Sequence, residues 1–214
     1  MVKLFSPNML RTFESCPKKF ELKYVKNISM PIDDSIFETG KNIHALASYY
    51  LKRENITNLE KELTEQEKVL WNYLKETEYL KYEPVNTEYN LTVKIGDFFF
   101  GGRLDAIVKN NDYYYILDYK TGKIPKNATY DFQTMIYMLC VQRFFKTYNL
   151  SFIYMNLKHQ VNTEIGFSPE LALEYETKLK TIAESIQKQD YSASRNECDT
   201  CEYRIICYDK KLSD

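Results

Sequence analysis

The sequence predicts a mixed α/β fold, because the spacing of its hydrophobic residues changes along the chain. Apolar residues recur at helical intervals near both ends, whereas the middle of the chain alternates apolar and polar residues as strands do. No repeat, low-complexity stretch or Pro/Gly/Ser-rich linker divides the 214 residues. A chain of this length can bury roughly 70% of its surface on folding. We therefore expect a single domain over residues 1–214.

Three helices are expected before residue 80. Ser6 and Pro7 supply an N-cap and a first-turn residue for a helix that runs towards Cys16. A second helix is predicted over residues 35–53. A third is predicted over residues 64–79, where the opening sequence T-E-Q-E is a capping-box pattern.

Three consecutive strands are expected next. Residues 87–95 alternate between apolar and polar side chains, and residues 98–108 and 113–119 are rich in aromatic and β-branched side chains. The remaining elements are predicted, in order, as a helix over residues 128–146, short strands over residues 151–157 and 161–167, and an amphipathic helix from Ser168 to about Gln189. This order predicts a mixed sheet, mostly an antiparallel meander, flanked by helices.

Two aspartates and a lysine are expected to converge on one face of these strands. Asp118 and Lys120 are two residues apart on a strand and point the same way, while Asp105 comes from the preceding strand. Converging carboxylates repel each other, and a hard divalent cation such as Mg²⁺ or Mn²⁺ relieves the repulsion. The Tyr119 carbonyl could add another oxygen, and the lysine could act on water or phosphate. Spacing alone is equally consistent with ordinary surface charges.

The turn between the two strands decides how the aspartates face each other. Asn110-Asn111 predicts a tight two-residue turn, because asparagine tolerates a positive φ. That register puts Asp105 opposite Ile116 and diagonal to Asp118, on the order of 7–8 Å away by Cα. A four-residue loop would place the aspartates directly opposite, and a three-residue loop would point them to opposite faces.

Four of the five cysteines form a pattern that suggests ligation. Cys198, Cys201 and Cys207 follow a C-x₂-C-x₅-C spacing, and Cys16 could supply a fourth thiolate. Cys140 lies on the predicted helix over residues 128–146 and is expected to be a small buried side chain. The spacing alone does not separate structural zinc from a [4Fe–4S] cluster.

Charge and hydropathy limit the possible partners. The formal net charge is −1, so any surface that binds nucleic acid must be local. No run of 18 apolar residues exists, as a membrane-spanning helix would need. The apolar stretch among the first residues is too short for a signal peptide. We therefore expect a cytoplasmic protein with no membrane partner, in a compartment where structural disulfides are rare.

Four motifs occur in an order that resembles the RecB-like branch of the PD-(D/E)XK nuclease superfamily. They are a histidine, His44, four residues after Gly40; G-x-x-D ending at Asp105; D-x-K from Asp118 to Lys120; and Q-x-x-x-Y from Gln133 to Tyr137. The resemblance implies a restriction-endonuclease-like core. It implies that the metal ion, Mn²⁺ or Mg²⁺, is held by His44, Asp105, Asp118 and the Tyr119 carbonyl.

The same resemblance implies roles for the other motif residues. Lys120 would join the two aspartates in catalysis, and Gln133 and Tyr137 would contact DNA near the metal. Tyr137 could instead simply flank the core, since apolar residues run beside it on the helix. The resemblance also suggests Glu88, before the first central strand, as a weaker candidate site residue, although it could be any surface glutamate.

The cysteine pattern brackets the nuclease motifs, and this arrangement resembles the iron–sulfur nucleases. These include CRISPR-associated iron–sulfur exonucleases and the nuclease domains of AddAB-type helicase–nucleases. The resemblance implies that a structural [4Fe–4S] cluster joins the N-terminal helices to the C-terminal segment, with structural Zn²⁺ as the alternative. The ligands would be Cys16, Cys198, Cys201 and Cys207.

The expected function is metal-dependent hydrolysis of DNA by an exonuclease that acts on single strands or duplex ends. No G-x₄-G-K-[S/T] motif is present, which favours a stand-alone nuclease over a helicase–nuclease. The alternative is a DNA-binding subunit with little activity of its own, within a DNA repair, recombination or CRISPR-adaptation complex with protein partners.

Overall fold

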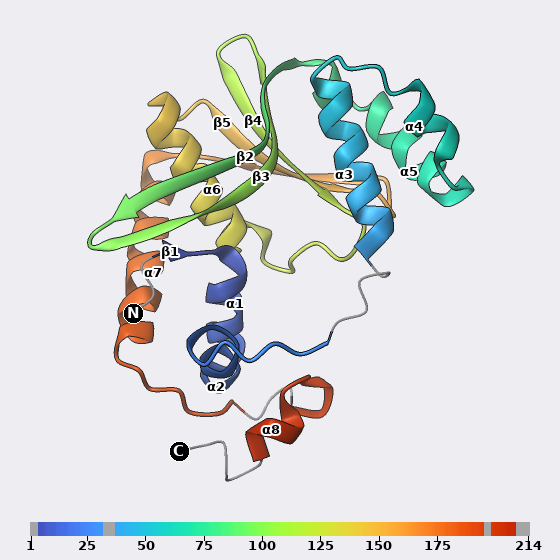
Figure 1. The fold of residues 1–214 in the computed structure, drawn as a ribbon. Helices are drawn as coiled ribbons and strands as arrows, with labels where there is room; N and C mark the ends of the chain where they lie inside the picture. The colour runs from blue at the N-terminus through green and yellow to red at the C-terminus, as the bar shows by residue number, and fades with distance from the viewer. Residues whose placement is uncertain (1–3, 32–36, 195–197, 209–214) are drawn as a thin grey trace.

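A computed structural model describes residues 4–31, 37–194 and 198–208. A mixed sheet lies between two groups of helices (Figure 1). Its strands are β1 (Leu4–Phe5), β2 (Glu83–Ile95), β3 (Phe98–Asn110), β4 (Tyr113–Lys120), β5 (Leu150–Asn156) and β6 (Val161–Gly166). The predicted mixed α/β fold is therefore confirmed.

The strands follow the order β1-β3-β4-β5-β6, and β2 also pairs with β3. The β2–β3, β3–β4 and β5–β6 pairs are antiparallel, as a meander requires. The β4–β5 pair is parallel, because α6 (Phe132–Phe145) crosses over between these strands. The short strand β1 adds to β3 in parallel, and the sequence did not predict it.

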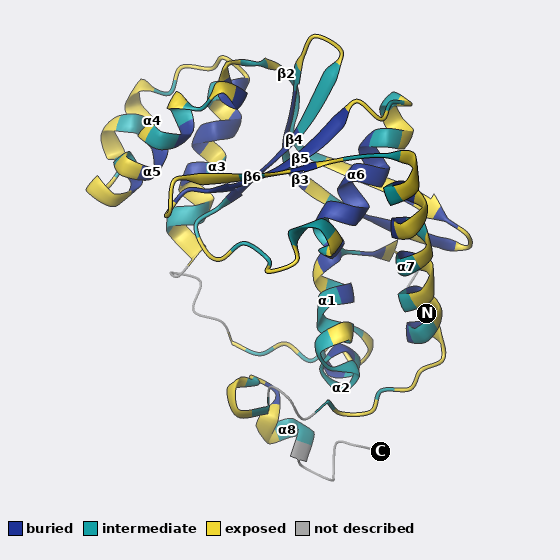
Figure 2. Ribbon diagram, turned by 180° about the vertical axis from the view of Figure 1, so that it is seen from behind, coloured by how far each residue is buried: buried dark blue, intermediate teal, exposed yellow. Residues whose placement is uncertain are grey.

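One face of the sheet is covered by α6, by α7 (Pro169–Gln187) and by α1 (Pro7–Ser15). Residues 134–141 of α6 are all buried, which is why this helix is apolar on every side rather than amphipathic. Figure 2 shows α6 as the most deeply buried helix, between the sheet and α7. This face contains the larger of the two hydrophobic cores.

The other face is covered by α3 (Glu38–Leu51) and α5 (Glu65–Glu76), with α4 (Thr57–Glu62) beside them. The predicted capping box is present, since Thr64 and Glu67 exchange hydrogen bonds at the start of α5. Glu67 also accepts a hydrogen bond from Asn42 Nδ2 at 2.8 Å, which ties α5 to α3. The second core lies between these helices and the sheet, and α3 is thereby fixed over β3 and β4.

The N-terminal helices and the C-terminal segment meet away from the sheet (Figure 1). The N-terminal part continues through α2 (Pro17–Phe20) and a π-helix, η1 (Glu21–Val25), and the C-terminal part holds α8 (Arg204–Tyr208). Tyr203 donates a hydrogen bond to the Ile28 carbonyl at 2.8 Å, and Lys19 forms an ion pair with Glu202 at 2.9 Å. These contacts join segments that are far apart in sequence.

Most predicted elements are present with shifted ends. The helices predicted over residues 35–53, 64–79, 128–146 and 168–189 correspond to α3, α5, α6 and α7. Residues 35 and 36 lie outside the described residues. The predictions over residues 64–79 and 128–146 extended too far because short 3₁₀ helices, η3 (Glu78–Lys81) and η4 (Ala128–Tyr130), adjoin α5 and α6.

Candidate active site

The turn between β3 and β4 sets the register of the two strands that carry Asp105 and Asp118. Asn110 pairs with Tyr113, so the turn residues are Asn111 and Asp112, with Asn111 at a φ of 53°. The predicted even loop is confirmed, but the predicted register is wrong by two positions because Asn111 and not Asn110 opens the turn. The pairing ends with Ala106 opposite Leu117, and this register, continued by one residue, would set Asp105 across from Asp118 rather than diagonal to it.

His44 brings α3 to these strands. Its Nδ1 atom lies 3.2 Å from Asp105 Oδ1, and its Nε2 atom lies 2.9 Å from the Tyr119 carbonyl oxygen. The other Asp105 oxygen, Oδ2, accepts a hydrogen bond from the Tyr119 N–H at 2.9 Å. The structure thus brings together three of the predicted metal ligands, counting the Tyr119 carbonyl. Burial lowers the pKa of His44, but the hydrogen bond and charge of Asp105 outweigh it and raise the pKa overall.

Asp118 is almost fully buried beside them, with 2% of its surface exposed. Its Oδ2 atom lies 2.7 Å from Lys120 Nζ. Burial raises the pKa of Asp118 to about 6, with the nearby Asp105 adding to the shift and Lys120 opposing it. A buried carboxylate next to a second one favours a bound cation, because the cation offsets the cost of holding both charges out of water.

The structure places Gln133 and Tyr137 in different surroundings, Gln133 beside Lys120 and Asp118 and Tyr137 in the core. Gln133 Oε1 accepts a hydrogen bond from Lys120 Nζ at 3.2 Å, and its Nε2 atom donates to Asp118 Oδ1. Tyr137 is buried, and its hydroxyl donates to the Arg103 carbonyl at 2.8 Å. A Cβ atom at Gly102 would lie only 2.8 Å from that hydroxyl, so the tyrosine packs directly under β3. The geometry supports the core interpretation of Tyr137.

Replacing Tyr137 with phenylalanine is expected to lower the free energy of unfolding by about 1–3 kcal/mol, because the Arg103 carbonyl loses its partner. The rate of DNA cleavage by the folded variant should stay within about twofold of wild type, because the buried Tyr137 hydroxyl bonds to the main chain of β3. Denaturant unfolding and a cleavage assay measure the two effects. Tyr148→Phe, at an exposed tyrosine on the surface, is the control. A large loss of cleavage at unchanged stability would instead support a DNA contact.

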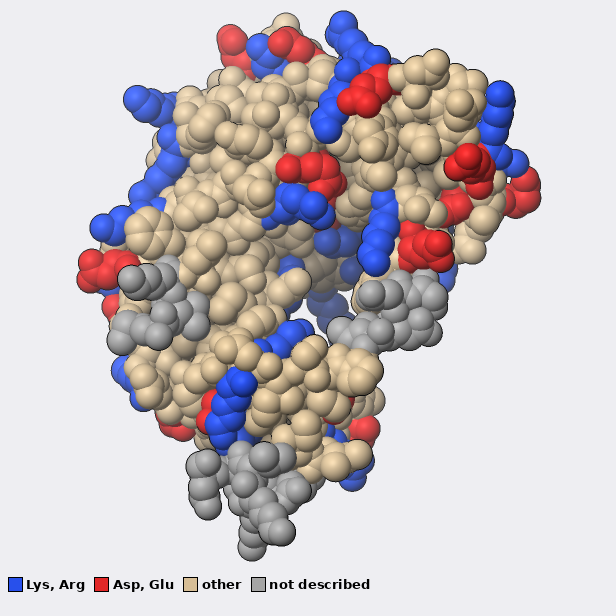
Figure 3. Space-filling view, in the orientation of Figure 1, with Lys and Arg blue, Asp and Glu red and all other residues tan. Residues whose placement is uncertain are grey.

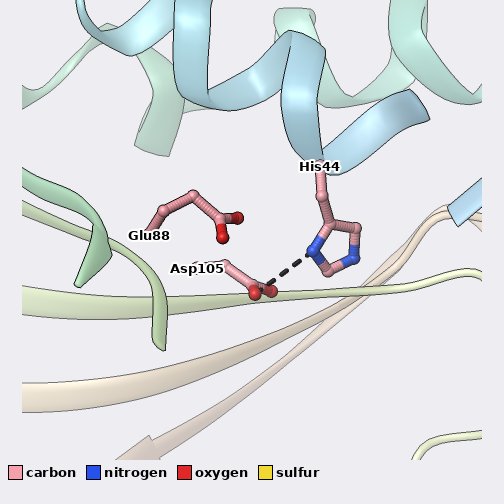
Figure 4. Close-up of side chains that lie close together, drawn as sticks. All are labelled: His44, Glu88 and Asp105. Atoms are coloured by element: carbon pink, nitrogen blue, oxygen red, sulfur yellow. Dashed lines mark ion pairs between the residues drawn. The ribbon is translucent and has the colours of Figure 1, made fainter. Parts of the chain in front are cut away.

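Glu88 joins this group from β2. It lies opposite Asp105 in the β2–β3 register and has a φ of 50°, in the left-handed region that a glutamate rarely adopts. Among the described residues, His44, Glu88 and Asp105 are the one group of three metal-ligating side chains whose ligand atoms lie within 4.8 Å of one another. Figure 4 shows the three side chains converging from α3, β2 and β3. Glu88 was only a weak candidate from the sequence, because no sequence pattern predicts its left-handed backbone conformation.

Replacing Glu88 with glutamine is expected to raise the metal concentration needed for half-maximal cleavage by roughly 10–100-fold, as loss of ligand support typically does. Titration of cleavage with Mn²⁺ measures this effect. Glu83→Gln is the matched control, since Glu83 also lies on β2 and pairs with a cation on β3, Lys109 Nζ at 3.3 Å. An unchanged metal requirement in Glu88→Gln would exclude Glu88 from the site.

A cleft of about 710 Å³ opens beside His44. One wall is a face of α3 with side chains at intervals of three or four residues, and the other wall comes from β2, β3 and the end of β4 with the two residues after it. The exposed ring of Tyr49 and four cationic side chains line it, namely Lys41, Lys52, Arg103 and Lys120. Figure 3 shows a hollow in the middle of this face with Lys and Arg side chains around it. A protein with a formal net charge of −1 thus concentrates positive charge at this cleft.

Two residues behind the site were not found from the sequence. Arg11 of α1 forms an ion pair with Asp131, the N-cap residue of α6, with Nη2 to Oδ1 at 2.5 Å. An aspartate two residues before Gln133 is a recognisable N-cap signal, but the predicted helix start at residue 128 hid it. No sequence pattern links Arg11 to a residue 120 positions away.

The four patterned cysteines gather at one cavity. Cys16, at the end of α1, lines it together with Cys198, Cys201 and Cys207. Burial raises the pKa of the Cys207 thiol, with the other three cysteines adding to the shift. Cys140 lies on α6 and is buried in the larger hydrophobic core, and this burial raises the pKa of its thiol to about 12. The expected separation of Cys140 from the other four is confirmed.

Within the described ranges, no helix combines the length and the apolar character that a membrane crossing requires.

The chain is similar to known nucleases in sequence and in fold. A model of the PD-(D/E)XK nuclease superfamily matches residues 4–78 and 55–208. The CRISPR-associated exonuclease Cas4 of Francisella tularensis subsp. novicida is 29% identical over 129 residues, or 57% of this chain and 63% of that protein. The chain therefore covers less than two-thirds of that relative. A crystal structure of a candidate exonuclease from Eubacterium rectale shares the fold, with a TM-score of 0.58 and 13% identity over 95% of this chain and 88% of that one.

Proposed function

The chain belongs to the PD-(D/E)XK nuclease superfamily, and on this premise we propose that it is a metal-dependent exonuclease that hydrolyses DNA. The observation that supports the proposal is two pairs of side chains, His44 with Asp105 and Lys120 with Asp118, whose His44 and Lys120 members line one cationic cleft. Cleavage by a nuclease requires a metal site, a cation beside the phosphate and a path for the DNA, and each has candidate residues here.

The donor set of the site fits a divalent metal ion. His44 offers a ring nitrogen, Asp105 and Asp118 offer carboxylate oxygens, and Tyr119 offers its main-chain carbonyl. Oxygen ligands suit Mg²⁺, and the imidazole nitrogen shifts the preference towards Mn²⁺. Such an ion, when bound, lowers the pKa of a water molecule and neutralises charge on the phosphate.

The residues around the metal ligands have separate tasks in this proposal. Lys120 holds a positive charge where negative charge develops on the phosphate, and Gln133 keeps that ammonium group beside Asp118. Lys41, Lys52 and Arg103 bind the DNA backbone along the cleft, because phosphates attract such side chains. Tyr49, which is 39% exposed, offers a ring on which a base of a single strand can stack.

The four cysteines are proposed to hold a structural [4Fe–4S] cluster. All four line one cavity, which supports a shared metal group. The resemblance of the cysteine spacing to that of iron–sulfur nucleases supports a cluster, and structural zinc is the alternative. Iron and zinc analysis of protein purified without oxygen distinguishes the two.

The proposal is tested by incubating the protein with end-labelled DNA in Mn²⁺, in Mg²⁺ and in EDTA. Linear single strands, linear duplexes and circular single strands are compared, because an exonuclease cannot start on a circle. Metal-dependent shortening of linear DNA with circles left intact is the expected result. Binding of DNA without cleavage in either metal would instead favour the DNA-binding subunit of a recombination, repair or CRISPR-adaptation complex.

A further inference from the structure

A guanidinium group from the N-terminal helix reaches the back of the candidate active site. Arg11 donates hydrogen bonds to Asp131 from Nε at 2.9 Å and from Nη2 at 2.5 Å. The same Nη2 atom donates to Gln133 Oε1 at 3.3 Å. These bonds cross the contact between α1 and α6 and reach the residue that touches both Lys120 and Asp118.

We propose that Arg11 is a positioning residue that fixes the side-chain amide of Gln133 and, through it, the ammonium group of Lys120 beside Asp118. The inference rests on the proposed function, because it concerns the same site. It adds a residue from outside the four sequence motifs.

The orientation of the Gln133 amide carries the argument. Its oxygen, Oε1, lies between two cationic donors, Arg11 Nη2 at 3.3 Å and Lys120 Nζ at 3.2 Å. Its nitrogen, Nε2, donates to the Asp118 carboxylate. A flipped amide would turn its N–H groups towards two cations and its oxygen towards a carboxylate, so one orientation is strongly favoured. Removal of Arg11 removes one of the two donors that set it.

Asp131 holds the guanidinium group in place. Its Oδ1 atom also accepts hydrogen bonds from the Gln133 N–H at 2.9 Å and from the Tyr154 hydroxyl at 3.1 Å. Burial raises the pKa of Asp131, but its hydrogen bonds with Arg11 and the arginine charge outweigh it and the net shift is downward. The carboxylate therefore stays charged at neutral pH and keeps Arg11 in a bidentate, geometrically specific pair.

Arg11→Ala is expected to lower kcat about 10- to 100-fold with little change in KM, because a small misplacement of a catalytic group is costly and the cleft is untouched. The Arg11 side chain is 34% exposed, so guanidinium ions can reach the vacated position. Millimolar guanidinium is expected to restore part of the lost kcat, and methylammonium is not. A purely structural role would show no such selective rescue.

The double variant separates direct from indirect action. Gln133→Ala alone should lower kcat, and Arg11→Ala should add nothing in that background, because Arg11 acts through Gln133. Arg143→Ala is the matched control: this arginine lies on α6, donates to the Lys94 carbonyl at 2.7 Å and pairs with Glu176 at 2.5 Å, away from the site. Its kcat should equal that of wild type.

Nuclear magnetic resonance gives a measurement that needs no cleavage. The side-chain amide signals of Gln133, identified by their loss in Gln133→Ala, should shift in Arg11→Ala and stay unchanged in Arg143→Ala. Unshifted signals, a wild-type kcat in folded Arg11→Ala, or additive losses in the double variant would each overturn the inference. If wild type cleaved no DNA, the proposed function would fail, and these signals would still decide the role of Arg11.

Discussion

Replacing Lys120 with alanine is expected to slow DNA cleavage by roughly 10²–10³-fold while the protein stays folded. The ammonium group lies 2.7 Å from Asp118 Oδ2 and 3.2 Å from Gln133 Oε1, at the wall of the cleft. Its charge is needed where negative charge develops on the phosphate, and alanine offers nothing in its place. Cleavage of linear DNA in Mn²⁺ measures the rate, and thermal unfolding followed by circular dichroism checks the fold.

The control for this variant is Lys109→Ala, on the same hairpin. Lys109 lies at the far end of β3 and pairs with Glu83 on the surface, so its loss should leave cleavage unchanged. DNA binding by Lys120→Ala in Ca²⁺ should remain close to wild type, since three other cations line the cleft. Undiminished cleavage by Lys120→Ala would refute the assignment of the active site.

Replacing Cys16 with alanine is expected to release the N-terminal helices from the C-terminal segment and to lower stability markedly. Closing a loop of nearly the whole chain is worth roughly 5 kcal/mol in the chain-entropy account, and ligation by thiolates is coupled to folding. The contacts that join the two segments include the hydrogen bond of Tyr203 with Ile28 and the ion pair of Lys19 with Glu202. When both proteins are purified without oxygen, Cys16→Ala should have less brown colour and less iron than wild type, and a melting temperature several degrees lower.

Cys140→Ala is the control for the cysteine variants. Cys140 is buried in the core next to β3, away from the cavity that the other four cysteines line, so iron content should stay at the wild-type level. Stoichiometric zinc without iron in the wild-type protein would contradict the cluster and leave a four-cysteine clip around a different metal. The nuclease proposal depends on other residues and would stand in either case.

The fold class was predictable because hydrophobic period and cap signals are local properties. Ser6 does cap α1, and the alternating and β-branched segments do form β2, β3 and β4. The short strand β1 and the helices α2 and α4 were not predicted. These elements are only two to six residues long, too short to show a periodic pattern.

The candidate site was predictable where chemistry follows from spacing along one strand. Asp118 and Lys120 needed only the two-residue period, whereas the position of Asp105 depended on which asparagine opens the turn. Both Asn110 and Asn111 tolerate a positive φ, and the pairing of whole strands decided between them. The strained backbone of Glu88 and the contact of Arg11 with Asp131 depend on tertiary structure, which no single segment contains.

The contact between the N-terminal helices and the C-terminal segment has a consequence for the order of events during synthesis. The residues that contact Ile28 and Lys19 emerge from the ribosome more than 170 positions later, as Tyr203 and Glu202. At 5–20 residues per second this delay is roughly 10–40 s, long enough for the β2–β3 and β3–β4 hairpins to form first. The sheet and its helices can thus assemble before the N-terminal helices form their contacts with Tyr203 and Glu202. Cys16 lies in the same N-terminal segment, so assembly of the proposed cluster would belong to the final step of maturation.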